Sequence, residues 1–222
     1  MTQATSRLIF IISAIVALGP ISIDLYLPAM PSMVTVFGTS VDRVQLTLSS
    51  YLLGFAFFHL VCGPLSDRYG RKPVLLGGLS IYVLMSMLCA LSDSIEELII
   101  FRFFQAMGAC CAPTLGRAVV RDVFPPDQAV KALAYVSSLM ALAPVAAPSI
   151  GGLLLLYGDW SLMFWALALC GVFAMVLVIY GLPESLPEKQ SLHPRKIAKN
   201  YLTLFKSADY IGNVLTAACM YA

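Results

Sequence analysis

Six long apolar segments, separated by short polar turns, occupy most of residues 8–182 in this 222-residue chain. A helix needs about 20 mainly apolar residues to cross the hydrocarbon core of a bilayer, and each segment is close to or above that length. A membrane offers no water to pair with backbone groups, so spanning segments of this kind must be helical. The sequence therefore predicts an all-α polytopic membrane protein with spanning helices at 8–27, 44–65, 74–91, 98–116, 132–157 and 160–182.

The overall composition excludes a water-soluble protein. Hydrophobic residues make up 59% of the chain and charged residues only 12%, and the mean hydropathy is +0.85. Soluble domains average about 25% charged residues. The net charge is only +2, so nothing in the charge balance indicates a nucleic-acid partner.

Six cysteines are present, and all of them lie in or beside the apolar segments. They show no Cys-x-x-Cys pair and no accompanying histidine cluster. Small apolar packing residues are the expected role for cysteines in this setting. The sequence therefore predicts no disulfide and no metal site for Cys62, Cys89, Cys110, Cys111, Cys170 and Cys219.

The basic residues are distributed asymmetrically between the two sides of the predicted membrane region. Of the 14 lysines and arginines, 12 lie at the N-terminus, in the turns after the second and fourth helices, or in the segment after the sixth helix. Cytoplasmic loops carry an excess of Lys and Arg in membrane proteins. We therefore expect both ends of the six-helix block, including the N-terminus, to lie in the cytoplasm.

The most distinctive stretch is residues 63–75, GPLSDRYGRKPVL, between the second and third helices. Four of the six residues from Asp67 to Lys72 are charged, so we expect a very short charged turn. Gly63 and Gly70 permit close backbone approach and unusual dihedral angles. Pro73 suits the first turn of the next helix. A loop that merely orients the two helices is the simplest interpretation.

The same stretch resembles the signature of the major facilitator superfamily, Gly-x-Leu-x-Asp-Arg-x-Gly-Arg-Lys-x-x-Leu, at every defined position. The resemblance implies a conformational gate at Gly63, Asp67, Arg68, Gly70, Arg71 and Lys72. It also implies the N-terminal half of a twelve-helix fold built from two such halves. We expect a six-helix domain at 1–182, a cytoplasmic linker at 183–208 and the start of a seventh helix at 209–222, with a C-terminal half as partner.

Further matches resemble the Bcr/CflA group of drug:proton antiporters. They lie at residues 24–31 and 116–122, and Arg102, Gln105 and Gly108 fit the superfamily's arginine-bearing motif. The second stretch includes a cytoplasmic-loop cluster of Arg117, Arg121 and Asp122. In the fifth helix, the antiporter packing motif corresponds to Pro148, Gly151 and Gly152, with Ala143 and Ala147 where glycines are usual.

Two charged residues lie clearly within predicted spanning helices, and their burial marks them as candidates for function. A charge at the centre of a spanning helix costs about 2.5–3.5 kcal/mol on insertion scales. Counting about 1.5 Å per residue from the helix ends places both Asp24 and Arg102 in the outer third of the membrane. Gln105 shares a helix face with Arg102. Tyr26 and Tyr51 are candidates either for lining an apolar cavity or for packing.

These observations predict a proton-coupled efflux transporter for small amphiphilic drugs in a bacterial-type inner membrane. The coupling site would combine Asp24 and Arg102, and Asp67 would pair with Arg117 or Arg121 as a latch. The proton motive force would drive transport, without a cofactor. Proton-coupled uptake of a small metabolite is an alternative within transport. A scaffold or a membrane enzyme is the alternative from another class, although no nucleophile–base pair or metal-ligand spacing favours an enzyme.

Overall fold

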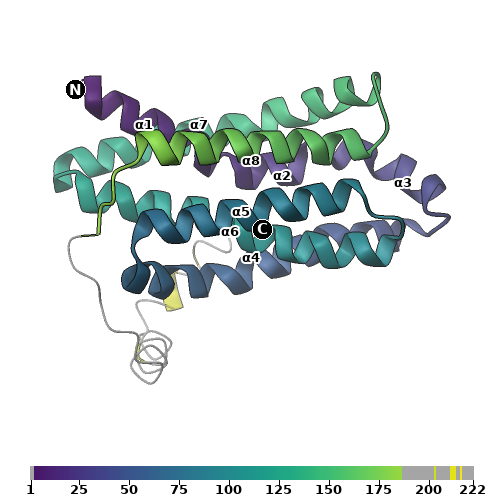
Figure 1. The fold of residues 1–222 in the computed structure, drawn as a ribbon, viewed down its shortest axis with the longest axis horizontal. Helices are drawn as coiled ribbons and strands as arrows, with labels where there is room; N and C mark the ends of the chain where they lie inside the picture. The colour runs from purple at the N-terminus through teal and green to yellow at the C-terminus, as the bar shows by residue number, and fades with distance from the viewer. Residues whose placement is uncertain (1–2, 187–202, 204–210, 214–215, 217–222) are drawn as a thin grey trace.

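A computed structural model describes residues 3–186, 203, 211–213 and 216 of the chain. Within them, six helical segments are long and apolar enough to cross a membrane, as predicted. They lie side by side along one direction (Figure 1). The predicted linker at 183–208 and the predicted seventh helix at 209–222 lie mostly outside the described residues. The elements are α1 (Gln3–Val16), α2 (Leu18–Asp24), η1 (Leu27–Ala29), α3 (Met30–Val36), α4 (Val41–Tyr69), α5 (Arg71–Ala90), α6 (Ile95–Val123), α7 (Pro126–Leu155) and α8 (Ser161–Gly181).

The first spanning segment is a broken helix that comprises α1, α2, η1 and α3. Proline lacks the N–H that would bond to the carbonyl four residues earlier. Pro20 removes the bond to Val16, where α1 ends, and Pro28 removes the bond to Asp24, where α2 ends. The prolines therefore account for both breaks, and the helical path continues to Val36, well beyond the predicted end at residue 27.

Helix α6 is the central element of the bundle. It packs against α4 and α5, while α8 also packs against α5, and α7 packs mainly against α1, α2 and η1. Close approach depends on glycine: a Cβ on Gly54 would overlap the Phe103 carbonyl oxygen, and a Cβ on Gly108 would overlap that of Gly78. Glycines on facing helices therefore bring α4 and α5 close to α6.

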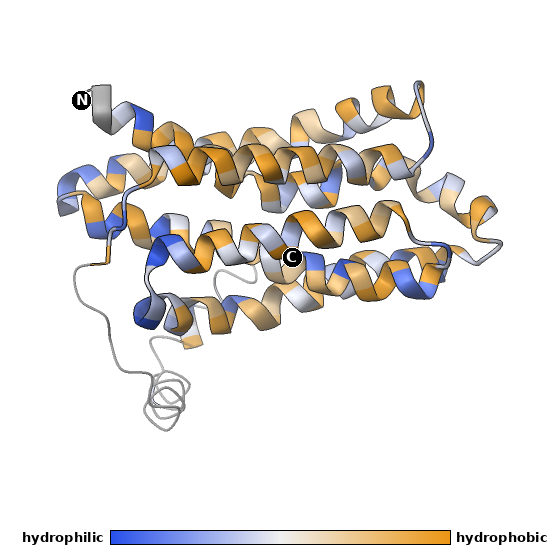
Figure 2. Ribbon diagram, in the orientation of Figure 1, coloured by the Kyte–Doolittle hydropathy of each residue, from blue (hydrophilic) through white to orange (hydrophobic). Residues whose placement is uncertain are grey.

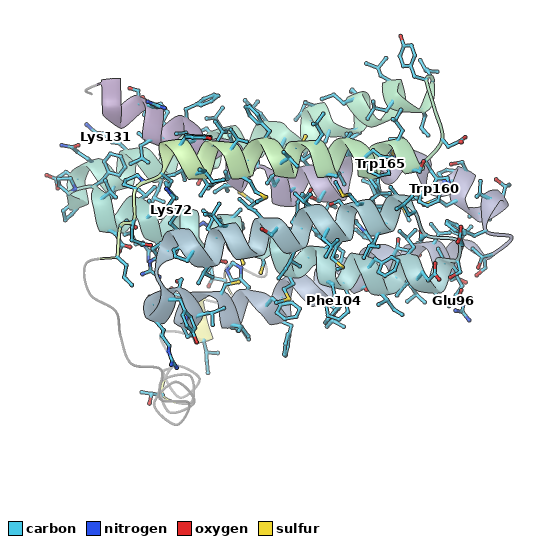
Figure 3. The ribbon with its side chains drawn as sticks, in the orientation of Figure 1. Lys72, Glu96, Phe104, Lys131, Trp160 and Trp165 are labelled. Atoms are coloured by element: carbon cyan, nitrogen blue, oxygen red, sulfur yellow. The ribbon has the colours of Figure 1, made fainter. Side chains whose placement is uncertain are left out.

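Hydrophilic residues are concentrated towards the two ends of the bundle, and hydrophobic residues predominate in its middle (Figure 2). Lys72 and Lys131 lie at one end, whereas Glu96 and Trp160 lie at the opposite end (Figure 3). At the second end, Ser94 caps α6 by accepting a hydrogen bond from the Glu97 N–H, and Ser40 caps α4 in the same way. The separation of basic and acidic ends agrees with the charge asymmetry of the sequence.

The turn between the second and third spanning helices is very short, as expected, and shorter than the gap between the predicted helix ends at 65 and 74. α4 continues through Asp67 and Arg68 to Tyr69, and α5 begins at Arg71, so Gly70 alone separates them. Arginine is a good helix former, and a charged residue at a helix end does not by itself stop the helix. The predicted charged loop at 117–131 is shortened in the same way, because α6 and α7 leave only Phe124 and Pro125 between them.

Candidate functional site

Arg102 is the centre of the candidate site. It lies on α6 with its side chain fully buried. Its Nη1 donates to the backbone oxygen of Ser22 at 3.0 Å and to Oε1 of Gln105 at 2.7 Å. Gln105 follows three residues later, so the two side chains share one face of α6. The interaction with Ser22 joins α6 to α2.

Aromatic rings surround the Arg102 guanidinium on several sides. Its Cζ lies 4.4 Å from the ring centroid of Tyr26, 4.4 Å from that of Tyr51 and 5.6 Å from that of Phe164. A desolvated cation over an aromatic face gains about 2 kcal/mol. Two such contacts are comparable to the insertion cost of about 2.5–3.5 kcal/mol for a central arginine. The rings thus help to explain how the charge is buried without a carboxylate.

Hydroxyl groups from neighbouring helices extend the polar cluster. Gln105 donates through Nε2 to Ser86 Oγ at 2.7 Å. The Ser22 and Tyr82 hydroxyls lie 2.6 Å apart. The Tyr26 hydroxyl lies 2.7 Å from the Thr47 hydroxyl. Side chains of α4, α5 and α6 are therefore tied to the broken first segment by one buried network.

Part of the guanidinium has no hydrogen-bond acceptor. Among the described residues, Nε and Nη2 of Arg102 are buried without a partner. A buried donor left unpaired costs roughly 1–3 kcal/mol, so such groups are uncommon. Arg102 therefore retains unused capacity to bind an acceptor in this conformation.

Asp24 lies apart from this cluster. It is the last residue of α2, is partly exposed, and has no hydrogen bond or ion pair to Arg102 within the described part of the chain. Arg102 instead holds the carbonyl of Ser22, two residues earlier. The structure brings Arg102, Gln105, Tyr26 and Tyr51 together and leaves Asp24 outside. Tyr26 and Tyr51 pack against the guanidinium with no exposed surface, so they line no open cavity here.

A second polar cluster lies at the basic end of the bundle, where α4 and α6 end and α5 begins. Arg71 bonds to Asp67 at 2.7 Å, to Asp122 at 3.1 Å and to the Ser66 hydroxyl. Arg71 is therefore the shared partner of two acids. The proposed pairing of Asp67 with Arg117 or Arg121 does not occur in this structure, in which both arginines are exposed and form no ion pair with a described residue.

Glu184, which follows α8, is a member of this cluster that the sequence analysis missed. Its carboxylate accepts hydrogen bonds from the backbone N–H groups of Arg71 and Lys72, at 2.9 and 3.2 Å. These are free donors at the start of α5, where a negative charge is favoured by the helix dipole. Lys72 also donates to the Ile179 carbonyl. The contacts tie the end of α8 to the start of α5, and no local spacing in the sequence signals them.

The glycines of the gate motif differ sharply in their surroundings. Gly70 has φ +108° and ψ 153°, and a Cβ there would lie 2.6 Å from Oε2 of Glu184. Gly63 lies inside α4, and a Cβ there would have open space around it. Arg68 extends to the surface over the Tyr69 ring. Gly70 is thus required by backbone geometry, whereas Gly63 is not.

In the packing motif of α7, as in the gate motif, one glycine is closely surrounded and the other is not. Ala143, Ala147 and Gly151 are buried on one face of the helix, and Pro148 is partly buried. A Cβ on Gly151 would overlap the Leu25 carbonyl oxygen, while Gly152 has open space. Gly151 therefore sets the contact between α7 and the break after α2.

Comparisons with known proteins agree with this architecture. The chain is 34% identical over 219 residues to the uncharacterized MFS-type transporter YdgK of Bacillus subtilis, 32% identical over 222 residues to a bicyclomycin resistance protein homolog of Haemophilus influenzae, and 31% identical over 202 residues to the multidrug resistance protein MdtL of Escherichia coli. These alignments cover 96%, 98% and 90% of this chain, and 54%, 56% and 52% of the relatives. The chain thus spans about half the length of the curated relatives it matches.

Solved structures share the fold at low sequence identity. The human organic anion transporter MFSD10 matches with a TM-score of 0.69 and 22% identity, and a D-xylose–proton symporter matches with a TM-score of 0.72 and 15% identity. Each match covers 89% of this chain and 53% of the solved chain. The family description "Major Facilitator Superfamily" matches residues 8–222, nearly the entire sequence. The chain therefore belongs to the major facilitator superfamily.

Proposed function

We propose that the protein containing this chain exports small amphiphilic drugs in exchange for protons, by alternating access of a central site to the two sides of the membrane. The names of the bicyclomycin resistance and multidrug resistance relatives support an efflux role. The buried Arg102 cluster is the observation that carries the proposal. A fully buried cation with unpaired donors is costly, and intramembrane charges of this kind commonly serve transport pathways.

The proposed proton carrier is Asp24. A carboxyl group binds protons more tightly when it loses water and less tightly when a guanidinium approaches. Asp24 is partly exposed and forms no ion pair with any described residue, so it can take up a proton without breaking one there. Arginine stays protonated and cannot carry the exchanged proton. Its role would be to change the proton affinity of Asp24 when the broken first segment moves relative to α6.

The second cluster would act as the conformational gate. Arg71 and Glu184 join the ends of α4, α5, α6 and α8 through charged hydrogen bonds. Charge-assisted bonds of this kind are roughly twice as strong as neutral ones. The cluster would therefore keep this end of the bundle rigid while the two halves of the transporter rock against each other.

We place the protein in the inner membrane, with the N-terminus and the basic end of the bundle in the cytoplasm. The proton motive force would supply the energy, and a C-terminal half would complete the cavity. An impermeant thiol reagent added to intact cells should label Asp159→Cys and should not label Tyr69→Cys. Labelling of Tyr69→Cys from outside would show that the chain has the opposite orientation.

Proton release on drug addition to the purified protein tests the coupling role of Asp24. Wild type should release protons, and Asp24→Asn should bind drug without releasing them. Asp159→Asn, an exposed acid in the turn before α8, is the matched control and should release protons as wild type does. Equal release from wild type and Asp24→Asn would show that another acid carries the proton.

A further inference from the structure

Three cysteine thiols from two helices meet inside the bundle. Cys62 on α4 lies 3.4 Å from the sulfur of Cys110 and 3.0 Å from that of Cys111, both on α6. The three sulfurs all lie within 4.8 Å of one another, and each residue is buried. Drug export as proposed above makes no use of them. Three convergent thiols are a recognisable set of soft ligands.

The fold forms this group by placing the Cys62 thiol of α4 against the thiols of Cys110 and Cys111 on α6. Consecutive helical residues point about 100° apart, so the sulfurs of Cys110 and Cys111 can flank a side chain from the facing helix. The backbone supports the arrangement: Cys110 donates to the Met107 carbonyl at 3.1 Å. On the other side, a Cβ on Gly78 of α5 would lie 2.6 Å from the Cys111 sulfur. Glycine at this position leaves the space that the thiol occupies.

Charge decides which ion such a group would bind. The site lies in a membrane-spanning region, where residual charge is expensive. Three thiolates around a monovalent metal leave two negative charges, and around a divalent metal one. A trivalent centre leaves none. A structural zinc site has four protein ligands, and no further His, Cys, Asp or Glu among the described residues joins the group to complete one.

We propose that Cys62, Cys110 and Cys111 form a binding site for a trivalent, thiol-reactive metalloid, with arsenous acid, As(OH)₃, as the simplest example. Each thiol proton combines with a departing hydroxide. Three As–S bonds form, three As–O bonds break and three water molecules leave. Arsenic stays trivalent, so no oxidant or reductant takes part, and the bound product is neutral.

The spacing of the thiols suits this product. In zinc–thiolate sites the metal–sulfur bond is about 2.3 Å, and three sulfurs bound at such a length to one centre lie about 3.3–4.0 Å apart. The observed contacts of 3.0 and 3.4 Å require only a small outward movement. On the same side of α4, the partly exposed ring of His59, one turn before Cys62, bonds to Thr114 on α6.

Arsenite binding to the reduced, purified protein tests the proposal. We expect about one arsenic atom per protein after removal of free arsenite, coordinated by three sulfurs in X-ray absorption spectra. Bound arsenite should protect the peptides containing Cys62, Cys110 and Cys111 from alkylation. Cys62→Ser should weaken binding at least about tenfold, since loss of even an outer-shell partner has an effect of that size.

Cys89→Ser and Cys170→Ser are matched controls, because these thiols lie outside the group and their loss should leave binding unchanged. The sulfur count and the alkylation pattern of wild type decide the matter even if Cys62→Ser fails to fold. Absence of retained arsenic, coordination by fewer than three sulfurs, or equal binding by folded Cys62→Ser would overturn the proposal. Retention of Cu(I) without retention of arsenite would refute the proposal that the site binds a trivalent metalloid.

Discussion

The two glycines of the gate motif provide a matched pair for a quantitative test. Gly70→Ala forces an L-residue into φ +108°, ψ 153°, a region that is essentially restricted to glycine and costs about 1–3 kcal/mol. Its Cβ would also lie 2.6 Å from the Glu184 carboxylate and displace it from the start of α5. Loss of a helix cap costs about 0.5–2 kcal/mol. Together the two effects amount to a destabilisation of about 1.5–5 kcal/mol.

Gly63→Ala should have the opposite effect. Gly63 lies inside α4, and a Cβ there meets nothing within 4 Å. Alanine is favoured over glycine in a helix interior by about 1 kcal/mol. For a chain of this size, 1 kcal/mol shifts the melting temperature by about 2–4 °C. We therefore expect Gly63→Ala to raise the Tm by a few degrees and Gly70→Ala to lower it by about 3–20 °C.

Thermal unfolding of the purified protein in detergent, followed by tryptophan fluorescence, measures both shifts. A Glu184→Ala background separates the two parts of the Gly70 effect, because the clash disappears and only the backbone strain remains. Gly70→Ala should lower the free energy of unfolding by about 0.5–2 kcal/mol more in wild type than in the Glu184→Ala background. A difference of this size is within the usual range for residues in contact. Shifts of the same sign for Gly63→Ala and Gly70→Ala would refute the reasoning.

Three further predictions concern residues of the two clusters and α7. Asp122→Asn should reduce drug efflux rate and Tm more than Asp67→Asn, because Asp122 is the less exposed partner of their shared guanidinium (20% against 40%); equal effects would contradict this. Gly151→Ala should lower the Tm by several degrees and Gly152→Ala should not, since only the former overlaps a backbone oxygen. Arg102→Lys should insert normally but lose drug-dependent proton release in vesicles, because lysine lacks the planar group held between two rings.

The sequence was sufficient to predict the fold class, because hydrophobic length is a local property. Six apolar segments of spanning length led to six helices, and the family match confirms the resemblance to the major facilitator superfamily. Spacing along one helix was equally informative: Arg102 and Gln105 three residues apart do share a buried face. The boundaries were less predictable. Charged residues such as Asp67 and Arg68 suggested a loop, but they extend α4 by a full turn.

Contacts between segments were beyond the reach of the sequence. Glu184 meets the start of α5 only through the packing of α8 on α5, with more than a hundred residues between them. The thiol group combines one residue of α4 with two of α6, and no ligand spacing reveals it. Asp24 and Arg102 were expected at similar depth, and Arg102 holds the carbonyl of Ser22, two residues before Asp24. Depth does not determine rotation about a helix, and Asp24 faces elsewhere.

The way in which Arg102 is buried bears on how Asp24 could function. A carboxylate paired with Arg102 in every state would keep a nearly constant proton affinity, because the guanidinium would always favour its charged form. Here aromatic faces, the Ser22 carbonyl and Gln105 hold the cation, and two of its nitrogen atoms have no partner in the described part of the chain. The acid and the base are therefore separate in this conformation, yet they belong to segments in direct contact. A modest rotation at the proline breaks on either side of α2 would change their separation, which is the property that a proton-exchanging pair requires.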